Sequence, residues 1–187
     1  MAKQFLELME REPIIPAVKD TEHLEEALRS RCEVIFLLCG DILNIDTLIA
    51  HLHQAEKKAV VHVDLIQGLA PREIAVDFLQ RCGADGIIST RPHLIHRGRE
   101  LGLGTVLRVF AIDSKAVSNL RREADEGRPD AIEVLPGAMP QVLARLSREI
   151  RIPLIAGGLL NDKADVMAAL SAGARCISTS NRRLWDL

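Results

Sequence analysis

Short apolar runs alternate with helical patterns along almost the whole chain, and each run ends at a polar or glycine-containing turn. The runs begin roughly 20 to 27 residues apart, which is the length of one strand-plus-helix unit. Several are continuously apolar, as strands covered on both faces are. The pattern therefore predicts parallel strands at Ile14–Val18, Val34–Cys39, Val60–Leu65, Gly86–Thr90, Thr105–Phe110, Ala131–Leu135, Pro153–Ala156 and Cys176–Ser180.

Capping residues mark the helices between these strands. Thr21 is expected to cap the helix that carries Leu24, and Asp113 the helix after the fifth strand. Pro92 suits the first turn of the helix after the fourth strand. Ala2–Glu10 has an amphipathic pattern before the first strand. By analogy with other barrels, we expect this added helix to close the bottom of the barrel.

Eight evenly spaced units favour a compact (β/α)₈ TIM barrel that occupies residues 1–187 as a single domain. The additions to the barrel are the N-terminal helix and a short C-terminal helix over Arg182–Leu187. The main alternative is an open, doubly wound sheet. That fold seldom needs eight such even units, and no G-x-G-x-x-G motif follows the first strand.

The amino-acid composition of the chain argues against several classes of function. The formal net charge of −2 argues against broad, non-specific binding of polyanions. Aromatic residues make up 3% of the chain, so a surface that stacks nucleobases is not expected. The four cysteines form no C-x-x-C pair and are expected to be reduced, buried thiols of a cytoplasmic protein. No signal peptide and no membrane-spanning segment is expected.

In a (β/α)₈ barrel the functional face is the one where the strands end. Four charged side chains are predicted there: Lys19, Asp64, Arg108 and Glu133. Lys19 and Arg108 can balance the charge of a phosphate, and Asp64 and Glu133 can accept hydrogen bonds from vicinal hydroxyls. In the alternative interpretation Arg108 and Glu133 form a buried ion pair, and Asp64 only orders its own loop.

The last two strands end in turns of the kind that bind phosphate. Gly157 and Gly158 follow the seventh strand, where the missing Cβ atoms let backbone N–H groups approach a ligand. Thr179, Ser180 and Asn181 end the eighth strand and add hydroxyl and amide groups. These are the strand positions that commonly cradle phosphate in this fold. The mouth is therefore predicted to bind a small phosphorylated polyol.

Metal and catalytic sites are not indicated. The histidines lack a set of neighbouring cysteines and carboxylates, and His62, which alternates with Val61 and Val63, is expected to face the barrel interior. An enzyme acting on a small phosphorylated sugar or polyol, of the isomerase or synthase type, is the alternative function, with Asp64 and Glu133 as an acid/base pair. A third possible function is that of a scaffold protein that needs no ligand.

Several motifs, taken in order, carry a family resemblance. They are Gly40-Asp41-Ile42, His62-Val63-Asp64-Leu65-Ile66, Ala84-Asp85-Gly86-Ile87-Ile88-Ser89-Thr90, Glu133-Val134-Leu135-Pro136-Gly137, Ile155-Ala156-Gly157-Gly158-Leu159 and Ile177-Ser178-Thr179-Ser180-Asn181. From about Pro13 to Trp185 the chain resembles the glycerol-uptake operon antiterminator regulatory proteins.

The resemblance implies a (β/α)₈ protein that senses glycerol 3-phosphate and needs no cofactor. When loaded, it would act on the leader mRNA of glycerol-utilisation genes without turnover. Carried over by position, Gly157, Gly158, Thr179, Ser180 and Asn181 would hold the phosphate. The oligomeric state is left open, a homo-oligomer included. Candidate RNA contacts are Arg91, Arg97, Arg99, Arg121, Arg122, Arg182 and Arg183.

Overall fold

The computed structural model describes residues 2–187, with side chains at positions 5–113 and 115–187. Eight parallel strands follow one another in sequence order around a closed barrel, and β8 pairs with β1 through Ile14 and Ile177. The TIM-barrel prediction is thereby confirmed, and the open sheet is wrong. The strands are β1 Ile14–Val18, β2 Val34–Leu37, β3 Lys58–His62, β4 Gly86–Ser89, β5 Gly104–Phe110, β6 Ala131–Leu135, β7 Leu154–Gly157 and β8 Cys176–Thr179.

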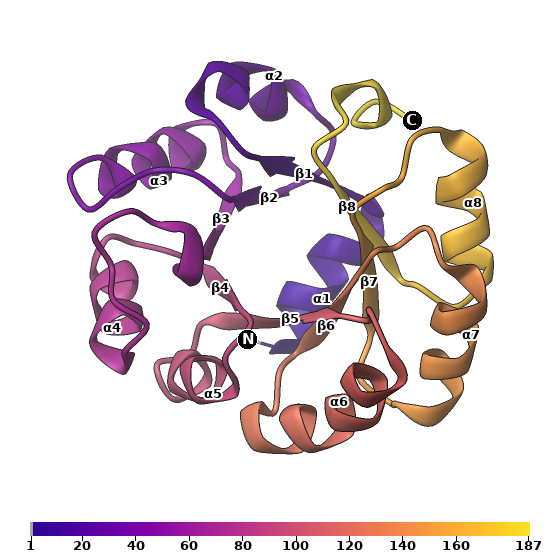
Figure 1. Cartoon of the computed structure of the whole chain (residues 1–187). Coiled ribbons are helices and arrows are strands. Elements are labelled where there is room, and N and C mark those ends of the chain that lie inside the picture. Colours follow the sequence, from indigo (N-terminus) through magenta and orange to yellow (C-terminus); the bar gives the residue numbers. More distant parts are fainter. Residues whose placement is uncertain (1) are drawn as a thin grey trace.

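Helices surround the barrel as a ring (Figure 1). None of the described helices is long and apolar enough to cross a membrane. The α-helices are α1 Ala2–Arg11, α2 Leu24–Arg29, α3 Ile45–Gln54, α4 Glu73–Arg81, α5 Pro92–Glu100, α6 Ser114–Gly127, α7 Pro140–Glu149 and α8 Lys163–Ser171. Three short 3₁₀ helices are η1 Thr21–His23, η2 Val63–Leu65 and η3 Arg182–Leu184.

Alternate strand residues divide the core into two layers. Outward-facing side chains such as Ile35, Val61 and Leu107 pack in the layer between strands and helices. Inward-facing side chains such as Phe36 and Val106 fill the barrel itself. Burial on both faces explains why these strands are continuously apolar. The core inside the barrel lies toward the amino ends of the strands, which leaves the carboxyl ends for polar groups.

Helix α1 closes the amino end of the barrel, as expected by analogy with other barrels, and lies across its middle in Figure 1. Phe5 and Met9 are buried among the inward-facing strand residues. A Cβ atom on Gly104, the first residue of β5, would lie 2.7 Å from the Phe5 ring, so glycine is needed for this close packing. At the start of β8, the Cys176 thiol lies 3.4 Å from the Met9 carbonyl oxygen.

The structure corrects three details of the sequence prediction. Strand β3 ends at His62 and continues as η2, so Asp64 sits in a helical turn and not in the strand. Thr21 lies inside η1, and Asp20 occupies the cap position with no side-chain hydrogen bond. The C-terminal helix is the single turn η3, which begins where the Asn181 side chain caps it. The expected cap Asp113 does accept a hydrogen bond from the first turn of α6, and Asp162 caps α8 in the same way.

All four cysteines are free thiols, but only two of them are fully buried. Burial raises the pKa of Cys32 to about 11 and that of Cys176 to about 12. Cys39 and Cys82 are half-buried, and burial raises the pKa of each thiol. Because the thiolate is the reactive form, raised pKa values make these thiols poor nucleophiles.

Candidate functional site

The two predicted phosphate-binding turns lie side by side at the carboxyl ends of β7 and β8. Gly157 pairs with Ser178 in the sheet register. Beyond the strands, the side-chain amide of Asn181 donates a hydrogen bond to the carbonyl of Asn161, at 3.0 Å, which joins the two loops directly. The predicted neighbourhood of the β7 and β8 turns is therefore present in the structure.

The β7 turn has a backbone that requires glycine. Gly158 has φ +74°, and the following Leu159 has φ +59°, so two consecutive residues adopt left-handed conformations. The N–H of Gly137, in the loop after β6, donates to the carbonyl oxygens of Gly157 and Gly158 at 2.6 and 3.0 Å. A Cβ atom on Gly157 would lie 2.6 Å from Oε1 of Glu133. The turn is thus held from the neighbouring loop and lies directly against the Glu133 carboxylate.

The three polar residues at the end of β8 have different roles. The Thr179 hydroxyl accepts a hydrogen bond from the Asn181 N–H, and the Thr179 carbonyl accepts one from the Trp185 indole. The Asn181 side chain is engaged at both ends, because its oxygen also caps η3 through Arg183 N–H. Ser180 is exposed. Ser180 is therefore the side chain of this group best placed to contact a ligand, while Thr179 and Asn181 shape the loop.

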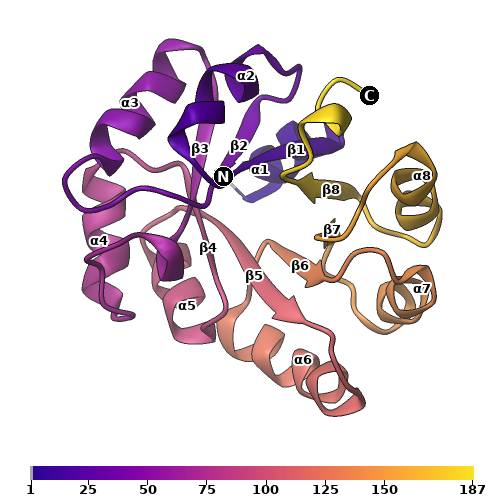
Figure 2. The ribbon, with the colours of Figure 1, turned by 45° about the horizontal axis from the view of Figure 1, so that its top comes forward.

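Lys19 extends the site toward β1. It is exposed at the carboxyl end of that strand and lines a cavity of about 190 Å³ together with Ser180, Arg182 and Trp185. The C-terminal segment lies between α2 and α8 in both views of the molecule, and Arg182 forms an ion pair with Glu26 of α2 (Figure 2). The structure thus brings Lys19 together with the β8 turn, as the sequence predicted.

Arg108 and Glu133 form an ion pair inside the barrel. They are aligned by the register of β5 and β6, and Nε of Arg108 donates to Oε2 of Glu133 at 2.5 Å. The side chains are 8% and 1% exposed. The ion-pair alternative from the sequence is therefore what the structure contains. The pair lies beneath the β7 turn, since the other carboxylate oxygen of Glu133 faces Gly157.

Asp64 organises the loop after β4 and not its own loop. Its carboxylate accepts hydrogen bonds from the Ser89 hydroxyl and the Thr90 N–H, both at 2.9 Å, and from Nε of Arg91 at 3.2 Å. This carboxylate is largely committed to the protein, and direct contact between Asp64 and a ligand stays a prediction.

His62 is the site residue that the sequence analysis undervalued. It is 2% exposed, and its Nδ1 has no hydrogen-bond partner among the described residues. Burial and the nearby Arg108 charge lower its pKa to about 4, while Asp64 opposes this shift. His62 is therefore a neutral imidazole at neutral pH. Alternation with Val61 and Val63 indicated that the ring faces inward, but no sequence signal indicated an unpaired nitrogen.

Taken together, the mouth has two polar levels. The turns after β7 and β8, with Lys19 beside them, form the rim. Below the rim, His62, Arg108 and Glu133 bring hydrogen-bond donors and acceptors into the barrel. An elongated small molecule with an anionic end and a hydroxylated end matches this arrangement.

Comparisons with known proteins identify the family of the chain. A family model described as "Glycerol-3-phosphate responsive antiterminator" matches residues 14–185. The uncharacterized protein YgcP of Escherichia coli (strain K12) is 39% identical over 184 residues, which cover 98% of this chain and 96% of that protein.

Solved structures give the same result. The glycerol uptake operon antiterminator regulatory protein from Listeria monocytogenes matches with a TM-score of 0.90 and 32% identity, over 93% of this chain and 95% of the other. A glycerol uptake operon antiterminator-related protein from Thermotoga maritima matches with a TM-score of 0.82 and 36% identity, over 92% and 96%. Deoxyribose phosphate aldolase from Aeropyrum pernix, at 18% identity and a TM-score of 0.69 over 95% and 88%, shares the fold alone. The chain belongs to the glycerol-3-phosphate responsive antiterminator family.

Proposed function

We propose that the barrel mouth binds glycerol 3-phosphate as an effector, and that the loaded protein acts in the cytoplasm on the leader mRNA of glycerol-utilisation genes. The observation that carries the proposal is the contact between the two levels of the mouth: Gly157 of the phosphate turn lies against Glu133 of the buried polar layer. A molecule of three carbons that binds its phosphate at the rim reaches that layer with its hydroxyls.

The rim suits the phosphate end. Lys19 supplies positive charge beside the Ser180 hydroxyl, and the half-buried Gly158 has no Cβ that would cover its backbone N–H. Arg182 lines the same cavity, but its charge is paired with Glu26. Arg108 and Glu133 suit the alcohol end, because a hydroxyl can accept from one and donate to the other. A phosphate alone or glycerol alone would satisfy only one of the two levels.

A regulatory role without turnover is supported by the state of the carboxylates. General acid or base catalysis needs a group that can exchange its proton with the substrate. Glu133 is held by the Arg108 guanidinium, and Asp64 accepts three hydrogen bonds from the β4 loop. Both carboxylates are thus positioned as hydrogen-bond acceptors more than as proton carriers.

The RNA part of the proposal is supported by a band of arginines far from the mouth. Three cavities of about 550, 490 and 490 Å³ are lined by residues of α5 to α8 and of the loops that lead into β6, β7 and β8. Their linings include two carboxylates, Asp125 and Glu149. They also include seven exposed arginines, which we call the arginine band: Arg99, Arg121, Arg128, Arg145, Arg148, Arg151 and Arg175.

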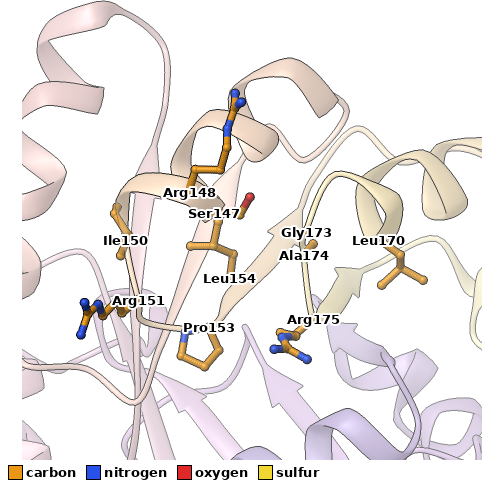
Figure 3. A pocket seen from close by; sticks show the side chains of 10 residues that line it. All are labelled: Ser147, Arg148, Ile150, Arg151, Pro153, Leu154, Leu170, Gly173, Ala174 and Arg175. Atoms are coloured by element: carbon orange, nitrogen blue, oxygen red, sulfur yellow. The ribbon is translucent and has the colours of Figure 1, made fainter.

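The arginine band suits an extended polyanion. Among the described residues, only Arg145 and Arg175 of the seven form ion pairs with carboxylates. In the largest of these three cavities, the guanidinium groups of Arg148, Arg151 and Arg175 point in different directions and do not converge on one point (Figure 3). Such a spread fits successive phosphates of a nucleic acid backbone better than a single small anion. A net charge of −2 for the chain does not prevent this local concentration.

Several arginines proposed from the sequence are engaged elsewhere. Arg91 pairs with Asp64, Arg97 with Asp77 and Arg182 with Glu26. Arg99 and Arg121 belong to the arginine band. An arginine in an ion pair can bind RNA only if it gives up the favourable free energy of that pair. The arginines of the band that have no ion pair are therefore the better RNA candidates.

Calorimetric titration with glycerol 3-phosphate, glycerol and inorganic phosphate tests the effector proposal. We expect saturable binding of glycerol 3-phosphate that is clearly tighter than that of either fragment, and no product when the mixture is analysed afterwards. Conversion of glycerol 3-phosphate, or of a panel of triose and pentose phosphates, would instead identify an enzyme. Equal binding of all three ligands would contradict the two-level site.

Charge reversal tests the RNA proposal on leader RNA with glycerol 3-phosphate present. Arg148→Glu with Arg151→Glu should weaken RNA binding and flatten its dependence on salt, because fewer phosphate contacts are made. Arg182→Glu with Arg183→Glu is the matched pair at the other end of the barrel. Loss of RNA binding only in this second pair, with glycerol 3-phosphate binding unchanged in calorimetry, would place the RNA at the C-terminal segment. Wild-type RNA binding by both pairs would reject both surfaces.

A further inference from the structure

His62 carries the least satisfied polar atom of the described core. Its ring lies at the end of β3 with 2% exposure, and Nδ1 has no hydrogen-bond partner. The nearest carboxylate oxygen, Oδ2 of Asp64, is 3.8 Å away, which is beyond hydrogen-bonding distance. Buried polar atoms in native proteins almost always have a partner, so this exception requires an explanation.

The protein itself offers Nδ1 no better partner. Asp64 is occupied by Ser89, Thr90 and Arg91. Arg108 also has only donor groups, and its charge keeps the imidazole neutral. A neutral imidazole nitrogen can donate or accept a hydrogen bond, depending on the tautomer. The natural complement is a neutral group that can do both, and a hydroxyl is such a group.

The position of His62 fits a ligand that enters from the rim. Val60 and His62 are two residues apart in β3 and so lie on the same face of the strand, and Val60 belongs to the inner core. The charge of Arg108 acts on His62, Arg108 binds Glu133, and Glu133 faces Gly157 of the phosphate turn. His62 thus belongs to the polar layer that the Arg108–Glu133 pair connects to the rim.

We propose that Nδ1 of His62 hydrogen-bonds a hydroxyl of the bound ligand, so that His62 is the residue by which the barrel recognises the alcohol end of its effector. The inference rests on the proposed function, since it assumes a phosphorylated ligand at the rim. It also defines the ligand class: the end away from the phosphate is an alcohol. A carboxylate there would face Glu133, and an alkyl group would leave Nδ1 unpaired.

The experiment removes the two hydrogen-bonding partners separately and together. Wild-type protein, His62→Phe and His62→Asn are titrated calorimetrically with glycerol 3-phosphate and with its two monodeoxy analogues, propane-1,2-diol 1-phosphate and propane-1,3-diol 1-phosphate. Phe keeps the ring volume without a polar atom. Asn carries a polar atom at nearly the same place as Nδ1 and serves as the conservative variant.

In wild-type protein, loss of the hydroxyl that contacts His62 should weaken binding by about tenfold, the effect of one ordinary hydrogen bond with a neutral partner. His62→Phe should bind glycerol 3-phosphate about as weakly as the wild type binds that analogue, and should no longer distinguish the two ligands. His62→Asn should recover part of the discrimination. A role of His62 in packing alone would change all three affinities equally and could not produce this pattern.

Two results overturn the inference. One is a wild type that binds all three phosphates with equal affinity. The other is full wild-type discrimination by His62→Phe, as expected if Nδ1 binds only a structural water. Both leave the effector proposal intact, because glycerol 3-phosphate is still bound. Absence of binding by the folded wild type, checked by its thermal unfolding transition, would reject the effector proposal and this inference together.

Discussion

Nε of Arg108 donates a hydrogen bond to Oε2 of Glu133 at 2.5 Å within the barrel, where both side chains are almost completely buried. This contact joins β5 to β6 and places a charged pair where most of the barrel interior is apolar. A buried pair of this kind contributes little net stability compared with apolar residues of similar volume. The ligand site that we propose above it accounts for its presence.

Breaking the pair should be costly. Arg108→Met leaves the Glu133 carboxylate buried without its cation, and should lower the free energy of unfolding by about 3–5 kcal/mol. Arg108→Met combined with Glu133→Leu removes both charges and should recover much of this loss while it abolishes ligand binding. Urea unfolding at neutral pH, without ligand, measures both. A double variant that recovers none of the loss would show that the pair stabilises the fold more than the apolar residues do.

Acid should destabilise the protein through His62. Its pKa is lowered from 6.5 to about 4 in the folded state, so the unfolded chain binds more protons between these values. The free energy of unfolding should therefore fall as the pH drops from 6.5 to about 4, by about 3 kcal/mol at 1.36 kcal/mol for each pKa unit. The difference between wild type and His62→Asn isolates the histidine, and parallel curves for the two proteins would contradict this assignment.

Gly158→Ala separates backbone strain from ligand binding. At φ +74° any side chain is strained, and we expect a loss of about 1–2 kcal/mol of stability. Gly83→Ala is the matched control: its φ is +94°, its new Cβ would meet only ordinary contacts at 3.6 Å, and it follows α4 at the amino end of the barrel. Both variants should lose similar stability in urea unfolding, whereas only Gly158→Ala should weaken glycerol 3-phosphate binding. Equal affinity in the two variants would remove the β7 turn from the site.

Trp185 should report ligand binding directly. It is the only tryptophan, its indole donates to the Thr179 carbonyl at 2.8 Å, and it lines the cavity beside Lys19 and Ser180. A phosphate bound at this rim should change its fluorescence emission and slow hydrogen exchange in residues 181–187. Titration with glycerol 3-phosphate, alongside calorimetry, tests both effects. Saturated calorimetric binding with unchanged emission and unchanged exchange would mean that the C-terminal segment does not respond to the ligand.

The strand pattern predicted the barrel well for a physical reason. Parallel strands buried on both faces must be apolar throughout, and this leaves a strong signal in the sequence. The exact ends of the strands were less predictable, because tertiary contacts decide at which residue the hydrogen bonding of a strand stops. His62 ends β3 where hydropathy alone would have extended it to Leu65.

The sequence predicted which residues lie near the mouth, but not which residues they hydrogen-bond. Strand ends identified Arg108 and Glu133, yet whether they bind each other depends on the register of β5 and β6, which no local pattern specifies. In the same way, Asp64 bonds with Ser89 and Thr90, which lie one unit further along the chain. Which polar groups remain for a ligand is settled only after the protein's own contacts are known.

Helix α1 leaves the barrel interior open only at the carboxyl ends of the strands. Because Phe5 and Met9 plug the amino end, a ligand has a single entrance, between the loops at the carboxyl ends of the strands. A phosphoester must then insert its neutral end first and leave its anionic group at this entrance. A bulky group on the carbon atoms that enter first would collide with the closed amino end of the barrel. A substituent on the phosphate would extend into solvent, and affinity probes for this protein are best attached there.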